Sequence, residues 1–497
     1  MTDSQTTRPA TSEPTDGRWT ALIVLCAGFM MIILDSTIVN VALPSIQADL
    51  GFSQSTLAWV VNGYLIAFGG LLLLSGRLGD LIGRRRVFLF GLALFTAASL
   101  ACGFAASQEV LVAARFIQGV GGALTSAVIL GMIVTMFPEP REQAKAIGIY
   151  SFVASAGASI GLLAGGALTQ AISWHWIFFV NVPIGVATAL LALRYVDDDK
   201  GLGLDKGADV LGALLATAAV MLGVYTVLKV GEHGWTSAHT LAFGAASLAL
   251  LAAFLMRETR AATPMIPLRV FRSRNLSGAS LTIVLMVAGL FGMFFLGVLY
   301  LQRILGYDAI ETGLAFLPVS TLIGVMSLGV SARLNLRFGP RATLLPGLAM
   351  VAVALAYFSR APVDGDYVAD VLPVVVLLGA GAGLVFPALT TISMTGVLPH
   401  DAGLASGVVN TSMQVGGAFG LAVLATLATD RTETLRAQGD SAAAALTGGY
   451  QLAFLVAAGL VGAAILLATL VLRSEPPVAE REQAQGRRDP EVALESA

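Results

Sequence analysis

Charged residues are scarce in this chain of 497 residues: Asp, Glu, Lys and Arg make up 12% of it, whereas 56% of the residues are hydrophobic. Average soluble proteins carry about twice that charged fraction, so the composition excludes a soluble globule. The formal net charge is only −2, and no basic patch is interleaved with aromatic residues. The sequence therefore predicts no nucleic-acid partner.

Cysteine and histidine are also rare. Cys26 and Cys102 both lie in apolar runs, so we expect small buried residues rather than a disulfide. The four histidines lack the spacing of metal ligands, and the chain has no nucleophile–His–acid pattern and no phosphate-binding loop. The sequence predicts no metal, no cofactor and no enzymatic activity.

Apolar runs of bilayer length are abundant. An α-helix needs about 20 residues to cross the hydrocarbon core. Such runs fall at 19–43, 56–75, 87–106, 109–136, 145–171, 175–196, 209–230, 239–256, 276–302, 311–332, 341–359, 368–396, 402–429 and 449–472. The sequence therefore predicts an all-α membrane protein with fourteen transmembrane helices, and the polar segments 1–18 and 473–497 are expected to be disordered tails.

Basic residues decide the orientation of such a bundle. If the N-terminus is cytoplasmic, 23 of the 29 Lys and Arg residues lie on the cytoplasmic side. This asymmetry predicts that both termini are cytoplasmic in a bacterial plasma membrane. The acidic connection at 196–208 is expected on the same side, because acidic residues weigh little in orientation.

The two ends of the chain resemble each other. SGRLGDLIGRR at 75–85 aligns without gaps with SARLNLRFGPR at 331–341. Three glycines recur at one spacing in each half: Gly148, Gly157 and Gly161, then Gly407, Gly416 and Gly420. We therefore expect a monomer with six-helix halves at 19–196 and 276–472, two inserted helices within 197–258 and a cytoplasmic linker at 259–275.

Two opposite charges are expected inside the membrane, Asp35 in the first run and Arg115 in the fourth. An aspartate at a helix centre costs about 2.5–3.5 kcal/mol on insertion scales, so its presence needs a reason. The favoured interpretation is a proton-coupling site, because a carboxyl group removed from water can gain and lose a proton near neutral pH. The alternative is a structural ion pair without a transport role.

A glycine-rich loop, GRLGDLIGRRR, follows the second run at residues 76–86. Its glycines permit a tight turn and close helix approach, while Asp80 and the arginines can form a breakable charge network. We expect a cytoplasmic gate formed by Gly76, Asp80, Gly83, Arg84 and Arg85. The alternative is a signal for orientation alone. This stretch resembles the signature loop of the major facilitator superfamily.

Three further motifs narrow the resemblance: LDSTIVNVALP at 34–44, RFIQGVGG at 115–122 and WHWIFFVNVPIG at 174–185. They resemble motifs of the drug:proton antiporters with fourteen spans, although His175 replaces the usual arginine. The resemblance implies the major facilitator fold and a part for Arg115 in proton transfer. It covers essentially the whole membrane domain.

The fifth run resembles the antiporter motif of that family. It keeps Gly157, Gly161, Gly165 and Gly166 and replaces the usual proline with Leu162. These small residues allow close helix packing. The missing proline removes a kink and leaves uptake open as an alternative direction of transport.

The substrate cavity is expected to be apolar, with Met and aromatic surfaces that suit varied ligands. The candidate lining residues are Met31, Ile38, Gln118, Phe291, Phe294, Phe295, Phe386, Asn410 and Gln414. Plain helix packing is the alternative for each of them. Because no second acid lies within the membrane, neutral or singly charged lipophilic compounds fit better than dications.

The sequence thus predicts a proton-driven exporter of amphipathic organic compounds, working by alternating access and driven by the proton-motive force without a cofactor. In this hypothesis Asp35 is occupied alternately by proton and drug. Two alternatives remain: proton-coupled uptake of a small nutrient, and a membrane sensor or scaffold that transports nothing.

Overall fold

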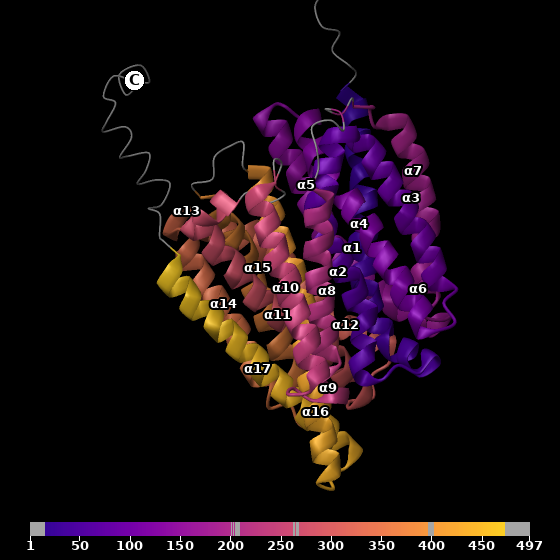
Figure 1. The fold of residues 1–497 in the computed structure, drawn as a ribbon, viewed down its shortest axis with the longest axis vertical. Coiled ribbons are helices and arrows are strands. Elements are labelled where there is room, and N and C mark those ends of the chain that lie inside the picture. The colour runs from indigo at the N-terminus through magenta and orange to yellow at the C-terminus, as the bar shows by residue number, and fades with distance from the viewer. Residues whose placement is uncertain are drawn as a thin grey trace, which may run out of the picture.

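The structure is a computed structural model that describes residues 15–199, 201, 203, 209–261, 264, 268–395 and 402–472. All regular elements in these ranges are helices (Figure 1), so the all-α prediction is confirmed. Residues 1–14 of the tail expected at 1–18, the tail 473–497 and parts of both linkers lie outside the described residues, whereas residues 15–18 already belong to the first helix.

The chain forms two groups of long helices with a hairpin between them. The first group is α1 (Thr15–Leu50), α2 (Gln54–Ile82), α3 (Arg84–Gly103), α4 (Gln108–Met136), α5 (Pro140–Ala171), α6 (Trp176–Phe179) and α7 (Asn181–Tyr195). The hairpin is α8 (Val210–Leu228), α9 (Val230–His233) and α10 (Ala238–Arg260). The second group is η2 (Leu268–Arg272), α11 (Arg274–Arg303), α12 (Ala309–Val325), η3 (Met326–Ser331), α13 (Ala332–Phe338), α14 (Pro340–Phe358), η4 (Tyr367–Val371), α15 (Leu372–Met394), α16 (Ala402–Ala437) and α17 (Ala442–Val471).

Twelve helices in the described residues are long and apolar enough to cross a membrane, or thirteen if the bent helix α2 counts as one span. The bend in α2 is 50° and falls between Leu72 and Leu74. In α5 only the part from Ile160 to Ala171 stands out as a shorter apolar helix. This count is lower than the fourteen runs predicted, and the difference lies in α2 and α5.

Helix packing repeats between the two halves. In the first half α1 packs against α5 and α7, α3 packs against α4 and α7, and α2 packs against α4. In the second half α11 packs against α16 and α17, α14 against α15 and α17, and α12 against α15. The partners correspond one to one, as expected if each half buries its apolar helix faces in the same way.

The aligned glycines Gly83 and Gly339 have equivalent conformations. Each has a positive φ, 103° and 85°, and each separates two helices. A side chain is strained in this region, so glycine is required at both turns. The repeat read from the sequence therefore marks the same tight turn in both halves.

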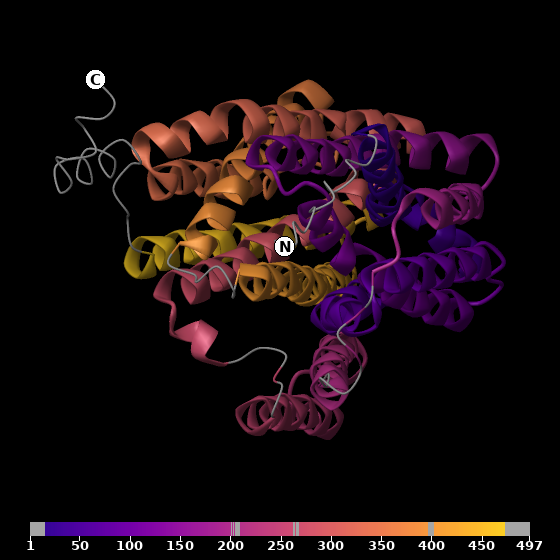
Figure 2. The same ribbon diagram turned by 90° about the horizontal axis from the view of Figure 1, so that it is seen from above.

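The two halves contact each other through α2 with α16 and α5 with α12. The inserted helix α8 packs on both α2 and α16, whereas α10 packs on α8 at the margin of the bundle (Figure 2). Only 11% of the most apolar segment of α10 is buried inside the protein, so most of this helix faces outward. The hairpin is therefore peripheral, attached along one of the two contacts between the halves.

Two hydrogen bonds between the halves lie near one end of the bundle, and a longer one joins Thr411 of α16 to the carbonyl of Gly69 in α2 at 3.4 Å. Gln170 at the end of α5 donates to Asp308, the N-cap of α12, at 2.9 Å. Gln302 near the end of α11 donates to the carbonyl of Val41 in α1 at 3.0 Å. The backbone N–H of Glu311 is the main cause that holds the pKa of Asp308 below its usual value, so this N-cap stays ionised. The halves are thus closed at the end away from the arginine-rich loop 76–86.

Candidate functional site

Asp35 lies at the centre of a buried hydrogen-bond network between α1, α4 and α7. Arg115 donates from Nη1 to Oδ2 at 2.6 Å, Gln118 donates from Nε2 to Oδ1 at 2.8 Å, and Asn181 donates from Nδ2 to Oδ1 at 2.9 Å. Asp35 is 0% exposed and Arg115 is 1% exposed. The two charges read from the sequence are therefore brought together in one buried ion pair.

Arg115 has its remaining contacts within the same half. Its Nε donates to the carbonyl of Val60 in α2 at 3.0 Å, and Nη1 also donates to Oε1 of Gln118 at 2.8 Å. The ring centroid of Tyr64 lies 4.5 Å from the guanidinium carbon. These contacts fix the guanidinium beside Asp35, which is the geometry a desolvated ion pair needs to offset its loss of water.

The sequence reasoning missed two members of this network, Asn181 and Ser99. Asn181 is the first residue of α7, and its Nδ2 also donates to Oγ of Ser99 in α3 at 3.1 Å. Ser99 in turn donates to the carbonyl of Phe178 at 2.9 Å. In the sequence, Asn181 stands out only as part of the motif at 174–185, and Ser99 does not stand out at all, because both side chains are neutral. A census of neutral polar residues within apolar runs would have found them.

The glycine-rich loop forms a hydrogen-bond network. This network lies at the opposite end of the bundle from the hydrogen bonds that Gln170 and Gln302 form between the halves. Arg84 donates to Asp80 at 3.0 Å and to the carbonyl of Gly131 in α4 at 3.0 Å, and Arg85 donates to the carbonyl of Leu193 in α7. In the part of the chain that the structure describes, the side-chain hydrogen bonds of these three gate residues all end within the first half.

Asp199 joins this network from the acidic connection after α7. Its carboxylate accepts hydrogen bonds from the backbone N–H groups of Arg84 and Arg85, and thereby caps the N-terminus of α3. Asp198 contacts Arg86 at 3.3 Å. Gly83 lies against Asp199, and Gly76 lies on the side of α2 near α4. The acidic connection therefore lies at the same end as the arginine-rich loop.

We predict that Asp80→Asn leaves the protein inserted but lowers transport turnover about tenfold. The charge that holds Arg84 is removed, so the loop can no longer favour one conformation of the bundle. Initial rates of efflux per inserted molecule measure this effect. Asp197→Asn, at an exposed position in the neighbouring connection, is the matched control. Efflux by Asp80→Asn at the parental rate would reduce the loop to an orientation signal.

The four glycines of α5 pack this helix against two neighbours. Gly157, Gly161 and Gly165 lie against α1, and the last of these contacts Ile38. Gly166 lies against the start of α12 in the other half. An added Cβ at Gly161 would come within 2.0 Å of Oγ1 of Thr37, so glycine is needed for this approach.

An apolar cavity of about 90 Å³ lies within the second half. Its lining comes from α11, α12, α15 and α16: Val287, Leu290, Phe291, Phe294, Val319, Ile323, Leu378, Ala382, Phe386 and Met413. Three of the predicted substrate residues, Phe291, Phe294 and Phe386, are therefore brought together.

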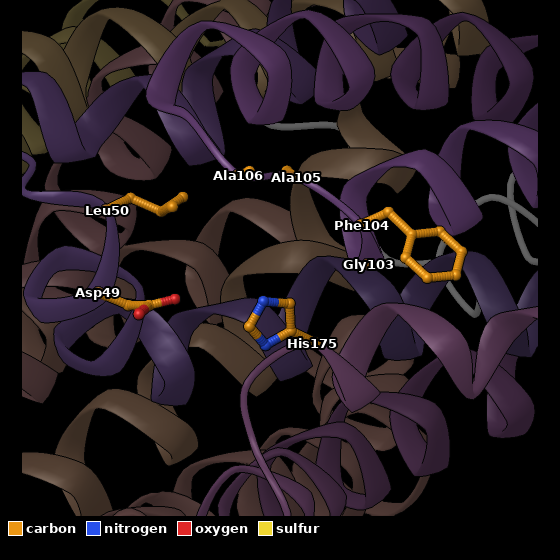
Figure 3. A pocket seen from close by; sticks show the side chains of 7 residues that line it. All are labelled: Asp49, Leu50, Gly103, Phe104, Ala105, Ala106 and His175. Atoms are coloured by element: carbon orange, nitrogen blue, oxygen red, sulfur yellow. The ribbon is translucent and has the colours of Figure 1, made fainter.

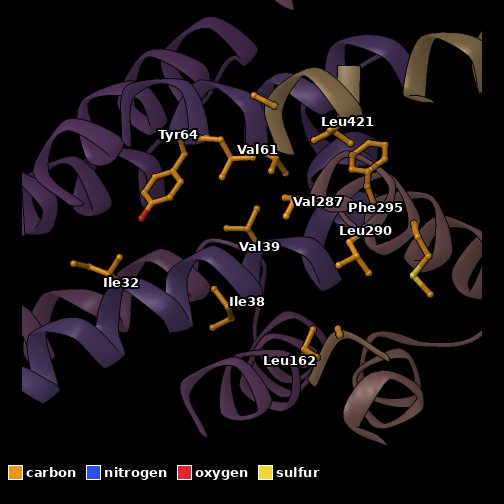
Figure 4. Close-up of a cluster of buried hydrophobic side chains, with 14 of the residues drawn as sticks. Ile32, Ile38, Val39, Val61, Tyr64, Leu162, Val287, Leu290, Phe295 and Leu421 are labelled. Carbon is orange, nitrogen blue, oxygen red and sulfur yellow. The ribbon is translucent and has the colours of Figure 1, made fainter. Parts of the chain in front are cut away.

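The structure places the other predicted substrate residues elsewhere. Met31 and Ile38 are buried in the first half, and Gln118 is bound to Asp35. Phe295 is buried in a cluster that joins side chains of both halves (Figure 4). Gln414 packs its stem on Gly69 of α2. Asn410 lies on the same helix α16 and is exposed.

These six residues lie outside the apolar cavity, so the nine predicted residues do not share one cavity lining. Met31 and Ile38 were assigned from their spacing around Asp35, but that face of α1 packs on other helices. Phe295 is adjacent to Phe294 in sequence and so points to a different side of α11. Neither Asn410 nor Gln414 is part of the lining of the apolar cavity.

A second hollow, of about 400 Å³, lies at the end where the halves are closed. It is lined by Asp49, Leu50, Gly103, Phe104, Ala105, Ala106 and His175 (Figure 3). Trp174 donates from Nε1 to Asp49 at 3.0 Å, and its ring stacks on His175 with centroids 3.8 Å apart. This contact ties the end of α1 to the segment before α6.

Within the described residues, no group of three or more His, Cys, Asp or Glu side chains could hold a metal ion. Cys26 and Cys102 are free and buried, as expected from the sequence. The chemistry that the buried network around Asp35 offers is that of one carboxyl group, one guanidinium and neutral hydrogen-bonding groups.

Comparison with known proteins agrees with this architecture. The family profile described as Major Facilitator Superfamily matches residues 25–421. The chain belongs to the major facilitator superfamily. Membership of the superfamily makes it a multi-pass membrane protein of a transporter family rather than an enzyme family, and it confirms the resemblance seen in the loop and helix motifs.

Relatives within the superfamily match over almost the whole chain. The puromycin resistance protein pur8 of Streptomyces alboniger is 39% identical over 94% of this chain and 94% of its own length. The cephamycin export protein CmcT of Amycolatopsis lactamdurans is 38% identical over 92% and 94%. Among solved structures, an inward-facing bacterial homologue of the human lysosomal transporter Spinster has a TM-score of 0.67 at 16% identity, covering 92% of this chain and 98% of its own. This last likeness shows the fold alone.

Proposed function

We propose that this superfamily member is a proton-driven exporter of amphipathic or lipophilic organic compounds, including antibiotics. The observation that carries the proposal is the buried pair of Asp35 and Arg115, with N···O at 2.6 Å. An acid at membrane depth is costly and calls for a function, and a proton carrier is the function that a carboxyl group can supply. The names of two relatives refer to puromycin resistance and cephamycin export, and both support the direction of transport.

The proton-motive force is adequate for such export. One proton that moves down about 100 mV supplies about 2.3 kcal/mol. This free energy supports a gradient of roughly fifty-fold for a neutral substrate. No cofactor is needed in this mechanism, and the partners are protons, the lipid bilayer and the exported compound.

The proposal includes fourteen spans and two cytoplasmic termini in the bacterial plasma membrane. The twelve apolar helices together with α2 and α5 supply fourteen candidate segments, arranged as six, two and six. The arginine-rich loop 76–86 supports this orientation, because basic residues favour the cytoplasmic side. The bundle then opens toward the cytoplasm, since the two shorter hydrogen bonds between the halves lie at the other end. We propose that it acts as a monomer.

Substrate and proton bind in different halves in this proposal. Asp35 has no exposed surface and already accepts three hydrogen bonds, so a drug cannot displace the proton there in this conformation. The apolar cavity of the second half accepts a lipophilic group of the substrate instead. This modifies our hypothesis of alternate occupation: the two ligands are coupled by movement of the halves rather than by sharing one carboxyl group.

We predict that Phe386→Ala raises the KM for lipophilic dyes about tenfold and leaves proton coupling intact. Burying a phenylalanine-sized contact contributes about 1.5–3 kcal/mol, and each 1.4 kcal/mol is tenfold in affinity. Phe90→Ala is the matched control, since Phe90 is 64% exposed on α3. Concentration series of dye efflux measure KM. An unchanged KM for every dye tested would remove the cavity from the substrate path.

The whole proposal is tested in everted membrane vesicles, in which the accumulation of a fluorescent dye is measured with and without a proton gradient. Proton-dependent dye accumulation in everted vesicles means export in the cell. Proton-driven movement in the reverse direction would establish uptake instead, and no movement would favour a sensor or scaffold.

A further inference from the structure

Protonation of Asp35 creates a hydrogen-bonding problem in the network described above. Each oxygen of its carboxylate faces only N–H donors: Arg115 on Oδ2, and Gln118 and Asn181 on Oδ1. When Asp35 takes up a proton, its new O–H group needs an acceptor. A buried hydroxyl group without an acceptor is costly, so one neighbour has to change its role.

Arg115 and Gln118 cannot supply that acceptor. The guanidinium of Arg115 has donors only. Gln118 has an acceptor, Oε1, but this atom already accepts from Nη1 of Arg115 at 2.8 Å and from Sγ of Cys102 at 3.6 Å. Rotating the amide of Gln118 would turn its N–H₂ group toward the guanidinium and set donor against donor.

Asn181 is different because one of its two polar atoms is unused. Its Nδ2 donates to Asp35 and Ser99, whereas its Oδ1 is buried without a hydrogen-bond partner. Rotation about the Cβ–Cγ bond exchanges the positions of these two atoms. After rotation Oδ1 faces Asp35 and can accept from the carboxylic acid. The hydroxyl of Ser99 can also turn to donate to it, in exchange for its hydrogen bond to the carbonyl of Phe178.

We propose that Asn181 is the positioning residue that reads the protonation state of Asp35. Its amide donates to the carboxylate and, after rotation, accepts from the carboxylic acid. The proton moves only onto Oδ1 of Asp35, and no bond to Asn181 forms or breaks. One polar atom of the amide lacks a partner in either state, so the exchange is nearly balanced and can run in both directions.

The position of Asn181 lets this rotation reach the closed end of the bundle. Asn181 begins α7 directly after the break that follows α6. The segment before α6 carries Trp174, which holds Asp49 at the end of α1. Helix α1 is therefore held at two points, by Trp174 at Asp49 and by Asn181 at Asp35. Only the second contact changes when Asp35 is protonated.

Other titratable groups around Asp35 do not offer the same role. They are distributed over three neighbouring helices: Arg115 on α4, Tyr64 on α2 and Cys102 on α3. The charged residues of α5, α7 and α11 lie at the ends of those helices. Asn181 is neutral in both states, so it responds to the proton on Asp35 without competing for it.

This inference rests on the proposed proton-driven export, and two nearly isosteric variants test it. Asn181→Leu has neither donor nor acceptor. We expect proton-driven efflux in vesicles to fall at least about tenfold at every pH, while downhill exchange of dye continues at close to the parental rate. Gln118→Leu removes a donor to the carboxylate and an acceptor for Arg115, but no group that could accept from the carboxylic acid. We expect it to remain active, with its pH profile moved upward.

Asn181→Asp keeps an acceptor and is the second test. Two carboxyl groups in hydrogen-bond contact cannot both ionise, so one proton is held to higher pH. We expect coupled efflux to continue with its pH optimum raised by about one unit or more. Asn40→Leu is the control for the loss of a half-buried amide on α1, because Asn40 donates to the carbonyls of its own helix.

The outcomes separate this inference from the proposed function. Parental rates and an unchanged pH profile in Asn181→Leu overturn the role of Asn181, provided that the parent is proton-driven and Asp35→Asn is uncoupled. Equal losses of coupled efflux and downhill exchange in Asn181→Leu also overturn it, because they indicate a structural role. If the parent itself shows no proton-driven efflux, the proposed function fails first.

Discussion

Asp35→Asn is expected to abolish uphill, proton-driven efflux while dye exchange down a gradient continues. Asparagine keeps the size of the side chain and can still accept from Arg115, but it cannot carry a proton. Asp35 is the only acid among the described residues that is fully buried at the centre of its helix, so no neighbour can replace it. Efflux from everted vesicles with and without a pH gradient measures the two activities separately.

Two further variants sharpen this test. Asp35→Glu keeps a titratable group on a longer stem, so we expect partial activity with a shifted pH dependence. Asp366→Asn is the control for the loss of one carboxylate. Asp366 is the N-cap residue at the start of η4 and is far along the chain from the network around Asp35. Uphill efflux at full rate in Asp35→Asn would sink the proposed mechanism.

Arg115→Met is expected to have the second-largest effect, on stability as well as on transport. Removing one partner of a buried ion pair leaves an uncompensated charge, which costs about 3–5 kcal/mol unless that charge is neutralised. Asp35 then favours its protonated form, so it no longer cycles between states. We predict loss of uphill efflux and a lower midpoint of thermal unfolding in detergent.

Combining the two changes separates stability from coupling. The double variant Asp35→Asn with Arg115→Met has no charge left in the network, so it should unfold at a higher temperature than Arg115→Met alone. Efflux by the double variant should remain uncoupled from the proton gradient. Arg115→Lys keeps the charge but cannot hold Val60, Gln118 and Asp35 with one planar group, so we expect an intermediate rate. Arg194→Met, at the end of α7, is the control.

A stable Arg115→Met variant with full uphill efflux would contradict this account. It would mean that the carboxyl group of Asp35 cycles without a nearby cation. The thermal midpoint of the double variant is the more direct measurement, because it depends on the ion pair and not on the direction of transport.

The sequence was sufficient for features that depend on rare residues or on local turns. Asp35 and Arg115 stand out because charges are scarce in apolar runs, and the structure joins them. The repeated loop predicted one turn twice, and Gly83 and Gly339 both have positive φ. A turn is determined by its own residues, so its signal survives in the sequence.

Features that depend on the rotation of a helix could not be read in the same way. Met31 and Ile38 share the helix of Asp35, yet which neighbour each one meets depends on tertiary packing. Asn181 could not be assigned to Asp35, because 146 positions separate them and a neutral amide carries no charge signal. The number of spans also depends on geometry, since the bend in α2 is not marked by a proline.

The inserted helix α8 makes the two lipid-facing flanks of the bundle different from each other. It packs on both α2 and α16, so it covers one of the two seams between the halves. Among the described helices no similar outer cover lies over the seam between α5 and α12 (Figure 2). A compound dissolved in the bilayer therefore meets a shielded seam on one flank and a bare one on the other. Among the described helices, the seam between α5 and α12 is therefore the flank on which no inserted helix separates the two halves from the lipid.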